Sequence, residues 1–529
     1  MARQLSLALP LRWSRWVTLA AGLFAMLCAG VAFTIGAIQS DIRETLGASE
    51  GQSQLISVAG NVGLWSKIVP GLVFDRFGGR VTLLGGALLA PLGYGLTYLA
   101  FRQLWQPELV AVGWLLAGHG SAWIYTGALF SSIKNFGPEE RSYVAGALAC
   151  AFGLSAPVFL ALMDGCLGGR VDAGGECVGG FLGGDVQRYL LFATLAVPSV
   201  VAPAAAVSFV REGAAPAPGD RAGLRFGALG VATVVLVAFV CGKNLYALEV
   251  DPSIGTWANY VLLALLGLLL TLPVGAAPHS PNPEQNADAT SSSEICEQKA
   301  GPPAQGLPLL SARYAALCCA FGVAVGGNVA TLNVTASMVQ ARHIQLKVAH
   351  LLVILSMGSD TLSRLATGYA AGRGVPLTLM LLGGTVLMAV AQVLLMAYGP
   401  LSVASAMFGV SHGIMWTAGA LYTGKAFGLR DVGRNFGLVV LAAAVMLFAS
   451  SLGVEPAVYR RHTAPGEEVC SGRGCFTATH AVQAALGGLA VVAAAYLHFA
   501  PAAPRKGARG DEAASEASDA TSESGSAQP

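Results

Sequence analysis

Charged residues are scarce in this chain. Asp, Glu, Lys and Arg make up only 11% of its 529 residues, while 54% are hydrophobic. A soluble globular protein carries about a quarter charged residues, so this composition excludes that class and indicates a protein with many membrane-spanning helices. The net charge of +2 provides no strongly basic surface, and we expect no nucleic-acid partner.

Recognisable sites of enzyme chemistry are also missing from the sequence. No group of His and Cys has the spacing of metal ligands, no Gly-rich phosphate loop follows a strand pattern, and no nucleophile elbow is present. We therefore expect no bound metal, no cofactor and no enzymatic activity.

Long apolar runs are what the sequence has instead. About fourteen runs have the 20–25 residues that a membrane-spanning helix needs. They begin near Trp16, Gln52, Val81, Leu109, Tyr143, Tyr189, Phe226, Ile254, Ala312, Val348, Pro376, Leu401, Phe436 and Thr479. The first run is expected to be an uncleaved signal anchor. A twelve-span arrangement, with one run lying in the interface or failing to insert, is the alternative count.

The runs divide the chain into five parts. The predicted parts are an N-terminal six-helix bundle (1–210), two additional membrane helices (211–276), a disordered cytoplasmic linker (277–308), a C-terminal six-helix bundle (309–503) and a disordered cytoplasmic tail (504–529). With the N-terminus inside, Lys and Arg are about twice as frequent in inner as in outer segments. This predicts a multi-pass protein with both termini cytoplasmic, in the plasma membrane or an endomembrane.

A short charged turn follows the second apolar run. A glycine at its start lets a neighbouring helix approach closely, and Gly78 or Gly79 can take the positive φ that a tight reversal needs. Asp75 can pair with arginines or with the positive end of a facing helix. The residues singled out in this turn are Gly71, Asp75, Arg76, Gly78 and Arg80.

Two apolar runs share a sequence pattern. The fourth reads His119-Gly-Ser-Ala-Trp123 and the twelfth reads His412-Gly-Ile-Met-Trp416, and in each Gly-Ala-Leu-aromatic and then Lys follow. Each is the fourth run of a six-helix block, and both cross in the same direction. This internal repeat predicts a duplicated bundle with two parallel, pseudo-symmetric halves.

Together, the charged turn and the repeat resemble the major facilitator superfamily of secondary transporters, and further residues resemble its nodulin-like branch. These are Gly60-Asn-Val-Gly63, Thr126-Gly-Ala-Leu129, Lys134-Asn-Phe136, Arg141, Gly153-Leu-Ser155, Asn333, Arg364 with Gly368, and the pair Cys470 and Cys475. The resemblance implies an all-α polytopic membrane protein of the major facilitator fold. It would have two pseudo-symmetric six-helix bundles plus two extra central helices.

In this superfamily the first and fourth helices of each half line a central cavity, so the resemblance places both His/Trp pairs there. We expect His119 and Trp123 to face His412 and Trp416 across the pseudo-symmetric centre. Trp would supply an apolar or cation-accepting wall, and His a hydrogen bond or a titrating proton. The alternative is a histidine bonded to a backbone carbonyl, with Trp as packing.

Asp360 and Arg364 lie one helical turn apart in the tenth run, where an ion pair would offset their burial. Asp360 is a candidate proton carrier together with the two histidines, and Arg364 a counter-ion or a clamp for a substrate carboxylate. A purely structural ion pair is the alternative.

Other polar residues complete the predicted cavity. Thr126, Asn328 and Asn333 are expected to bind substrate or, alternatively, to bridge helices. Lys67 is expected to extend to the membrane surface from a nearby helix end.

Four cysteines fall in predicted outer loops: Cys166, Cys177, Cys470 and Cys475. They allow three pairings, of which two local bridges are the simplest.

The preferred interpretation is a secondary active transporter that moves a small polar solute, an organic anion or an amino-acid-like molecule, by alternating access. Its expected partners are the small-molecule substrate, the lipid bilayer and, for symport, protons, and it is expected to act as a monomer. The charged turn would be a conformational latch on the cytoplasmic side. A solute receptor or scaffold of the same fold that does not transport is the alternative, and a channel is the third option.

Overall fold

The computed structural model describes residues 15–35, 45–162, 186–210, 221–249, 311–345, 347–463 and 470–500, with short pieces at 38, 42, 170–171, 177–178, 258, 260–262 and 264–267. Nearly all of this part is helical, and its strands are the two-residue β1 (Arg170–Val171) and β2 (Cys177–Val178), paired antiparallel. The predicted linker, the predicted tail and most of the run near 254 lie outside the described residues.

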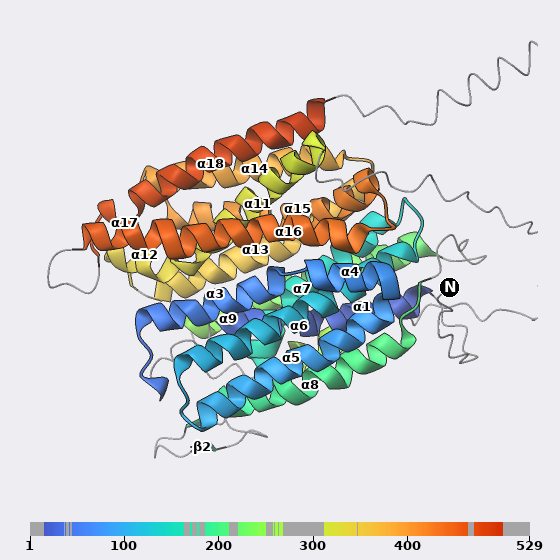
Figure 1. The fold of residues 1–529 in the computed structure, drawn as a ribbon, viewed down its shortest axis with the longest axis horizontal. Helices are drawn as coiled ribbons and strands as arrows, with labels where there is room; N and C mark the ends of the chain where they lie inside the picture. Colours follow the sequence, from blue (N-terminus) through green and yellow to red (C-terminus); the bar gives the residue numbers. More distant parts are fainter. Residues whose placement is uncertain are drawn as a thin grey trace, which may run out of the picture.

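The helices form two groups that follow the chain (Figure 1). The first group is α1 (Arg15–Ala29) with the 3₁₀-helix η1 (Gly30–Thr34), α3 (Glu50–Trp65), α4 (Ile68–Phe77), α5 (Gly79–Arg102), α6 (Pro107–Lys134), α7 (Arg141–Leu162) and α8 (Val186–Val207). The second is α11 (Ala312–Asn333), α12 (Thr335–Ala341), α13 (Lys347–Gly372), α14 (Leu377–Met396), α15 (Leu401–Phe427), α16 (Val432–Phe448), the π-helix η7 (Ala449–Val454), α17 (Glu455–His462) and α18 (Gly474–Phe499). Between them in sequence, α9 (Ala222–Glu249) packs beside α13 and α7. We call the two groups the N-half and the C-half.

Length and composition allow these helices to cross a membrane. Within the described ranges, 10 helical segments are both long and apolar enough to do so. Three less apolar helices, α6, α13 and α15, have 28, 26 and 27 residues and run alongside the others. At 1.5 Å per residue each is about 40 Å long, more than the ~30 Å of a hydrocarbon core. These three carry most of the polar residues that the sequence places in the cavity.

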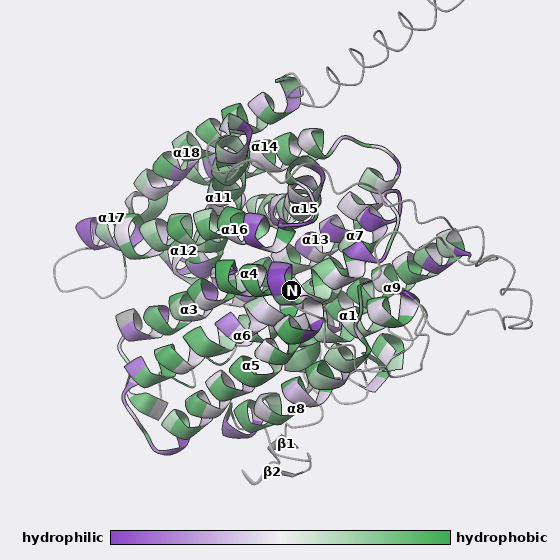
Figure 2. Cartoon of the chain, turned by 45° about the vertical axis from the view of Figure 1, so that its right-hand side comes forward, coloured by the Kyte–Doolittle hydropathy of each residue, from purple (hydrophilic) through white to green (hydrophobic). Residues whose placement is uncertain are grey.

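The outward surface of the molecule is apolar, as a lipid-facing surface must be. Leu88 of α5 is 73% exposed, Val231 of α9 67% and Val492 of α18 66%. Figure 2 shows that most helical turns are hydrophobic, with hydrophilic turns at helix ends such as α17. Such a continuous apolar exterior would aggregate in water but is matched to acyl chains.

The second membrane span is broken in its middle. Helix α3 ends at Trp65 and α4 starts at Ile68, although 52–77 is one apolar span. Pro70 explains the break, because its ring lacks an N–H and clashes with the carbonyl four residues earlier, that of Ser66. The break places Lys67 between the two helices.

The two halves meet along two seams that contain glycine. In one, Gly71 of α4 lies against the backbone of Gly433 in α16, and Gly437 lies against the Lys67 carbonyl. In the other, Gly146 of α7 lies against Gly368 of α13. Because no side chain stands between the backbones, the helices approach as closely as packing allows.

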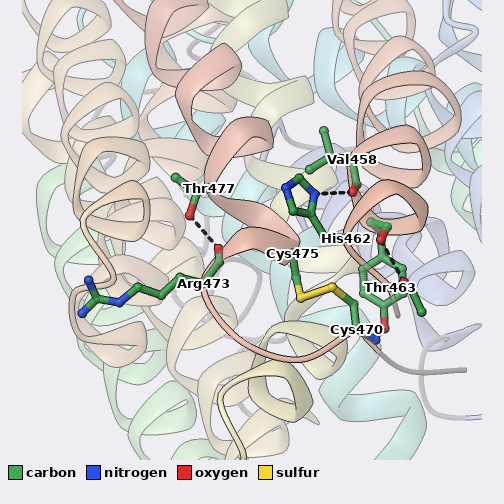
Figure 3. The surroundings of a disulfide bond; sticks show 8 residues. Val458, His462, Thr463, Cys470, Arg473, Cys475 and Thr477 are labelled. Atoms are coloured by element: carbon green, nitrogen blue, oxygen red, sulfur yellow. Dashed lines mark hydrogen bonds between the residues drawn. A yellow bond between two sulfur atoms is a disulfide. The ribbon is translucent and has the colours of Figure 1, made fainter. Parts of the chain in front are cut away.

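A disulfide closes the loop before α18, where Cys470 is joined to Cys475 (Figure 3). The Cys470 N–H donates to the Tyr459 hydroxyl in α17, and the Gly472 N–H donates to the Ala341 carbonyl in α12. The loop is therefore tied to three neighbouring helices. Cys166 lies outside the described residues, so its predicted bridge to Cys177 stays a prediction.

Candidate functional site

A buried ion pair lies at the centre of the molecule. On α13 the Nε of Arg364 donates to both carboxylate oxygens of Asp360 at 3.0 Å. On α15 the Nδ1 of His412 lies 3.0 Å from Asp360 Oδ1. Arg364 is 1% exposed, while the side chains of Asp360 and His412 keep 15% and 11%. The carboxylate is thus held by two neighbours yet retains limited access from outside the protein.

The hydrogen bonds define the protonation state of His412. The indole Nε1 of Trp416 donates to its Nε2 at 2.9 Å, so Nε2 is an acceptor and carries no proton. The proton must then be on Nδ1, which donates to Asp360. Arg364 Nη2 lies 3.3 Å from the same Nδ1, a contact between two donors and not a hydrogen bond. His412 is therefore neutral in this arrangement, and Asp360 is the acceptor for both neighbours.

Trp416 lies at the centre of an aromatic cluster that joins the two halves. It is 1% exposed. Its ring centroid lies 6.5 Å from that of Trp65 and 5.7 Å from that of Tyr125, both in the N-half. On the C-half side it lies 5.5 Å from Phe321 and 6.1 Å from Phe436. The indole therefore lies between the two halves, and its role in a substrate cavity stays a prediction.

Lys67 lies beside Trp416 between the halves, not at the position expected for it from the sequence. It is 1% exposed, and its Nζ lies 3.3 Å from the ring centroid of Tyr125 and 4.5 Å from that of Trp416. The expectation that it reaches the membrane surface is wrong. Ten helical residues, about 15 Å, separate it from the end of α4 at Phe77, and a lysine side chain is much shorter than that. The signal that could have revealed it was Pro70, which breaks the helix at that depth.

The N-half pair is placed differently from the C-half pair. Trp123 Nε1 donates to His119 Nε2 at 3.1 Å, so the internal hydrogen bond of the repeat recurs. However, His119 donates to the backbone carbonyl of Gly63 in α3, and the Trp123 ring lies over Gly85 in α5. The two pairs therefore do not face each other as expected, and Tyr125 is the α6 residue that contacts Trp416.

The remaining predicted cavity residues make bonds within their own half. Thr126 Oγ1 donates to the Ala122 carbonyl of its own helix. Asn328 is buried and its Nδ2 donates to Ser411 in α15 at 3.1 Å. Asn333 is exposed at the end of α11. The bonds of the first two are those of residues that bridge or pack helices.

A second buried polar network lies inside the C-half and was not predicted. Gln392 donates to Gln483 Oε1 at 2.5 Å and to Thr331 Oγ1 at 2.8 Å, and its Oε1 lies 2.9 Å from His480 Nδ1. Gln483 Nε2 in turn reaches Glu455 Oε1 at 3.4 Å. Glu455 is 4% exposed, and its hydrogen-bond donors among the described residues are neutral side chains, those of Ser450 and Gln483. Because these residues come from α11, α14, α17 and α18, no local pattern in the sequence brings them together.

Asp75 joins the halves through the first turn of α16. Its Oδ1 accepts from the Gly433 N–H at 3.0 Å and its Oδ2 from the Arg434 N–H at 2.8 Å. The sequence left two partners open, arginines or the positive end of a helix, and the structure has the helix end. These N–H groups have no acceptor within α16 because they belong to its first turn, so the carboxylate satisfies both.

The rest of the charged turn has distinct local contacts. Gly78 has φ +82° and no atom within 4 Å of a Cβ placed there, so it supplies the reversal between α4 and α5. Arg80 Nε donates to the Ser208 carbonyl at 2.6 Å, which fixes the start of α5 to the end of α8. Arg76 is exposed beside Phe77.

A cavity of about 390 Å³ lies between the halves at the same end of the molecule. Its lining comes from the C-terminal parts of α6, α13 and α15 and the N-terminal part of α7. Arg141 and Lys425 make it basic.

Solved structures share this fold across almost its whole length. The proton:xylose symporter XylE bound to 6-bromo-6-deoxy-D-glucose superposes with a TM-score of 0.56, at 13% identity over 92% of this chain and 95% of that one. A double-tryptophan variant of XylE gives 0.59, at 12% identity over 92% and 96%. These likenesses show the major facilitator fold, and the long apolar helices indicate an integral multi-pass membrane protein.

Sequence comparison narrows this class. A family model described as Nodulin-like matches residues 15–277. The chain is also 27% identical over 153 residues to Protein NUCLEAR FUSION DEFECTIVE 4 of Arabidopsis thaliana, a match that spans 28% of this chain and about a quarter (26%) of that protein. Residues 15–277, just under half of the chain, are thus similar to the nodulin-like family.

Proposed function

We propose that this protein is a secondary active transporter of a small polar solute, an organic anion or an amino-acid-like molecule, which works by alternating access with protons as the coupled ion. The observation that carries the proposal is the buried Asp360–Arg364–His412 cluster at the interface of the halves. Ionisable groups at such depth are costly unless they serve transport, and transporters of this architecture bind solute at the midplane between their repeats.

Asp360 is the proposed proton carrier. As a carboxylate it accepts from Arg364 and from His412. Protonation would remove its charge and one of its acceptor positions, which would release Arg364 to bind a substrate group. Proton binding and solute binding would then favour one another, as symport requires. The Trp416 hydrogen bond holds His412 in the tautomer whose Nδ1–H donates to Asp360. The described contacts of His119 include no carboxylate, so Asp360 is the better candidate for the coupled proton.

The conformational part of the proposal rests on the contacts at the α4–α5 end. We define the latch as Asp75 together with the Gly71–Gly433 contact. In the proposed cycle these contacts hold that side closed in one state and part in the other. The start of α1 lies at the same end (Figure 1), and the excess of Lys and Arg in the loops there supports a cytoplasmic location for the latch and the termini.

The test is uptake into proteoliposomes with and without an inward proton gradient. Once a substrate has been found by ligand-induced thermal shift, the wild-type protein should accumulate it faster with the gradient. The Asp360→Asn protein should lose that acceleration but still exchange substrate across the membrane. Glu139→Gln, at an exposed acid, is the matched control and should behave as wild type. Full gradient dependence in Asp360→Asn would refute the coupling role.

The same experiment separates the alternatives. A receptor or scaffold binds the solute with no uptake, and a channel gives uptake that does not saturate with concentration. Saturable uptake with exchange supports the carrier.

A further inference from the structure

We propose that Lys67 is the centre of a binding site for one carboxylate group, and that the transported solute is a monocarboxylate with an apolar body. This inference rests on the proposed transport function and specifies its substrate class. The sequence left organic anions and amino-acid-like molecules open and placed Lys67 at the membrane surface.

Four buried donors around Trp416 are unused in the part of the chain that the structure describes. They are Lys67 Nζ, Arg364 Nη1, Trp65 Nε1 and the Tyr125 hydroxyl. Each of these residues is at most 1% exposed. Buried donors without acceptors are costly, so a cluster of four indicates an acceptor that binds among them. The contacts of Lys67 Nζ with the Tyr125 and Trp416 rings offset only part of the cost of burying this polar group.

The contacts of these donors bring them to one place. Lys67 Nζ lies 4.5 Å and Arg364 Cζ 6.0 Å from the Trp416 ring centroid. The Tyr125 and Trp65 ring centroids lie 5.7 and 6.5 Å from it. We call this group the carboxylate seat.

Charge counting gives the number of negative charges that the seat can neutralise. Arg364 is cationic and Asp360 is anionic, so their charges balance, and His412 is neutral because its Nε2 accepts from Trp416. One further proton, on the Lys67 amine or on Asp360, gives the described central groups one net positive charge, which one carboxylate balances. Two carboxylates would leave an unbalanced negative charge in a dry site.

The same donors disfavour an amino acid. A zwitterion brings an ammonium group that needs an acceptor. The acid at the centre, Asp360, already accepts from Arg364 and His412. The other central walls are aromatic, from Phe321 and Phe436 beside Trp416. These walls suit an apolar body and leave the ammonium group of a zwitterion unpaired.

The carboxylate seat contains residues from both halves, which move relative to one another in the proposed cycle. Lys67, Trp65 and Tyr125 belong to the N-half, and Arg364 to the C-half. A carboxylate that contacts both Lys67 and Arg364 would therefore bind with different affinity when the two halves are in contact around Trp416 and when they are separated there. Such a difference in binding free energy is what couples a substrate to a conformational change.

The test is binding to the purified full-length protein in detergent, measured by thermal shift and calorimetry. The probes are phenylacetate, its uncharged isostere phenylacetamide, and the zwitterion phenylalanine, together with butyrate and butyramide. We expect the carboxylates to raise Tm at millimolar concentration, and the amides and phenylalanine to have at least tenfold weaker effects.

Variants test the residue itself. Lys67→Met leaves an unbranched side chain that is one atom shorter and removes the amine, so it should weaken carboxylate binding at least tenfold and raise the Tm of the ligand-free protein. Tyr125→Phe should weaken binding several-fold and provides a second test if Lys67→Met does not fold. Arg461→Met, at an exposed arginine of α17, is the control and should bind as wild type.

The outcomes distinguish the seat from the transport proposal. Equal stabilisation of wild type and Lys67→Met by phenylacetate, equal effects of phenylacetate and phenylacetamide, or no effect of either carboxylate on wild type would each overturn the seat. Charge-selective, Lys67-dependent binding with no uptake in liposomes would uphold the seat and refute transport. Saturable uptake that ignores Lys67 and ligand charge would do the reverse.

Discussion

Replacing Asp75 by Asn tests the contact that joins the halves at the α4–α5 end. The carboxylate accepts two backbone N–H groups, those of Gly433 and Arg434, at 3.0 and 2.8 Å. A hydrogen bond to a charged group contributes about 1.5–3 kcal/mol, and a negative charge at a helix N-terminus about 0.3–1 kcal/mol. Asn keeps one acceptor oxygen, so the substitution should remove one of the two bonds and the charge.

The expected loss is therefore about 2 kcal/mol for the contact, reduced from the sum because the side chain is partly exposed. Since 1.4 kcal/mol is a tenfold change in an equilibrium, the population in which α4 and α16 are parted should rise about 30-fold. The fold should be unaffected, because the bonds within each half remain. Uptake should slow, because the state closed at this end becomes less populated.

Hydrogen exchange read by mass spectrometry measures this directly. The amides of Gly433 and Arg434 have Asp75 as their described acceptor, so in Asp75→Asn they should exchange about 30-fold faster. The control is Asp431→Asn, beside the same helix start, whose side chain is 30% exposed and lies 3.8 Å from Arg434. It should change exchange and uptake little. Unaltered amide exchange and uptake in Asp75→Asn at normal expression would show that the carboxylate does not hold the halves together.

Three further substitutions follow from the contacts. Gly71→Ala puts a methyl group against the α16 backbone and should destabilise the closed seam by about 1–3 kcal/mol, seen as slower uptake, whereas Gly383→Ala, in open space on α14, should be silent. Trp416→Phe removes the donor to His412 Nε2 and frees the imidazole to change tautomer, so the pH dependence of uptake should shift while expression is kept; an unmoved profile would contradict the tautomer argument. Glu455→Gln preserves the hydrogen bonds to neutral neighbours and removes a carboxyl group from a buried site where no cation is described. The Tm should therefore stay the same or rise. A fall of several degrees would show that a charge is required at this position.

Hydropathy located the helices of this protein but not their internal breaks. Every predicted apolar run, apart from the one near 254 that lies mostly outside the described residues, coincides with a helix. Run length decides membrane crossing, and it is a local property. The depth of Lys67, by contrast, depends on where Pro70 interrupts a run that averages as apolar. A hydropathy value averaged over a window of residues does not reveal a single break in the helix.

The internal repeat predicted the topology of the halves better than the orientation of their side chains. The His/Trp hydrogen bond recurs in both copies, at 3.1 and 2.9 Å. Yet Trp416 faces the centre and Trp123 faces α5, where Tyr125 takes the central position. Two residues along a helix correspond to a rotation of about 200°, so a small displacement between the copies turns the motif to another side. Sequence identity does not determine this rotation, because packing against the neighbouring helices does.

The buried pair of the tenth run was predictable because its two members are local in sequence. Asp360 and Arg364 are one turn apart on one helix, and the ion pair forms as the spacing predicts. Its third member, His412, comes from another helix, and no feature of the sequence specifies that contact.

The break in the second span has a mechanical consequence. Lys67 precedes the first residue of α4 and Asp75 lies near its end, on a helix of only 10 residues that is separated from α3. A rod of that length, about 15 Å, moves as a rigid piece. Any movement of α4 that takes Asp75 away from α16 must therefore also displace the Lys67 amine at the other end of the helix. The contact between the halves and the position of this amine are mechanically coupled through α4.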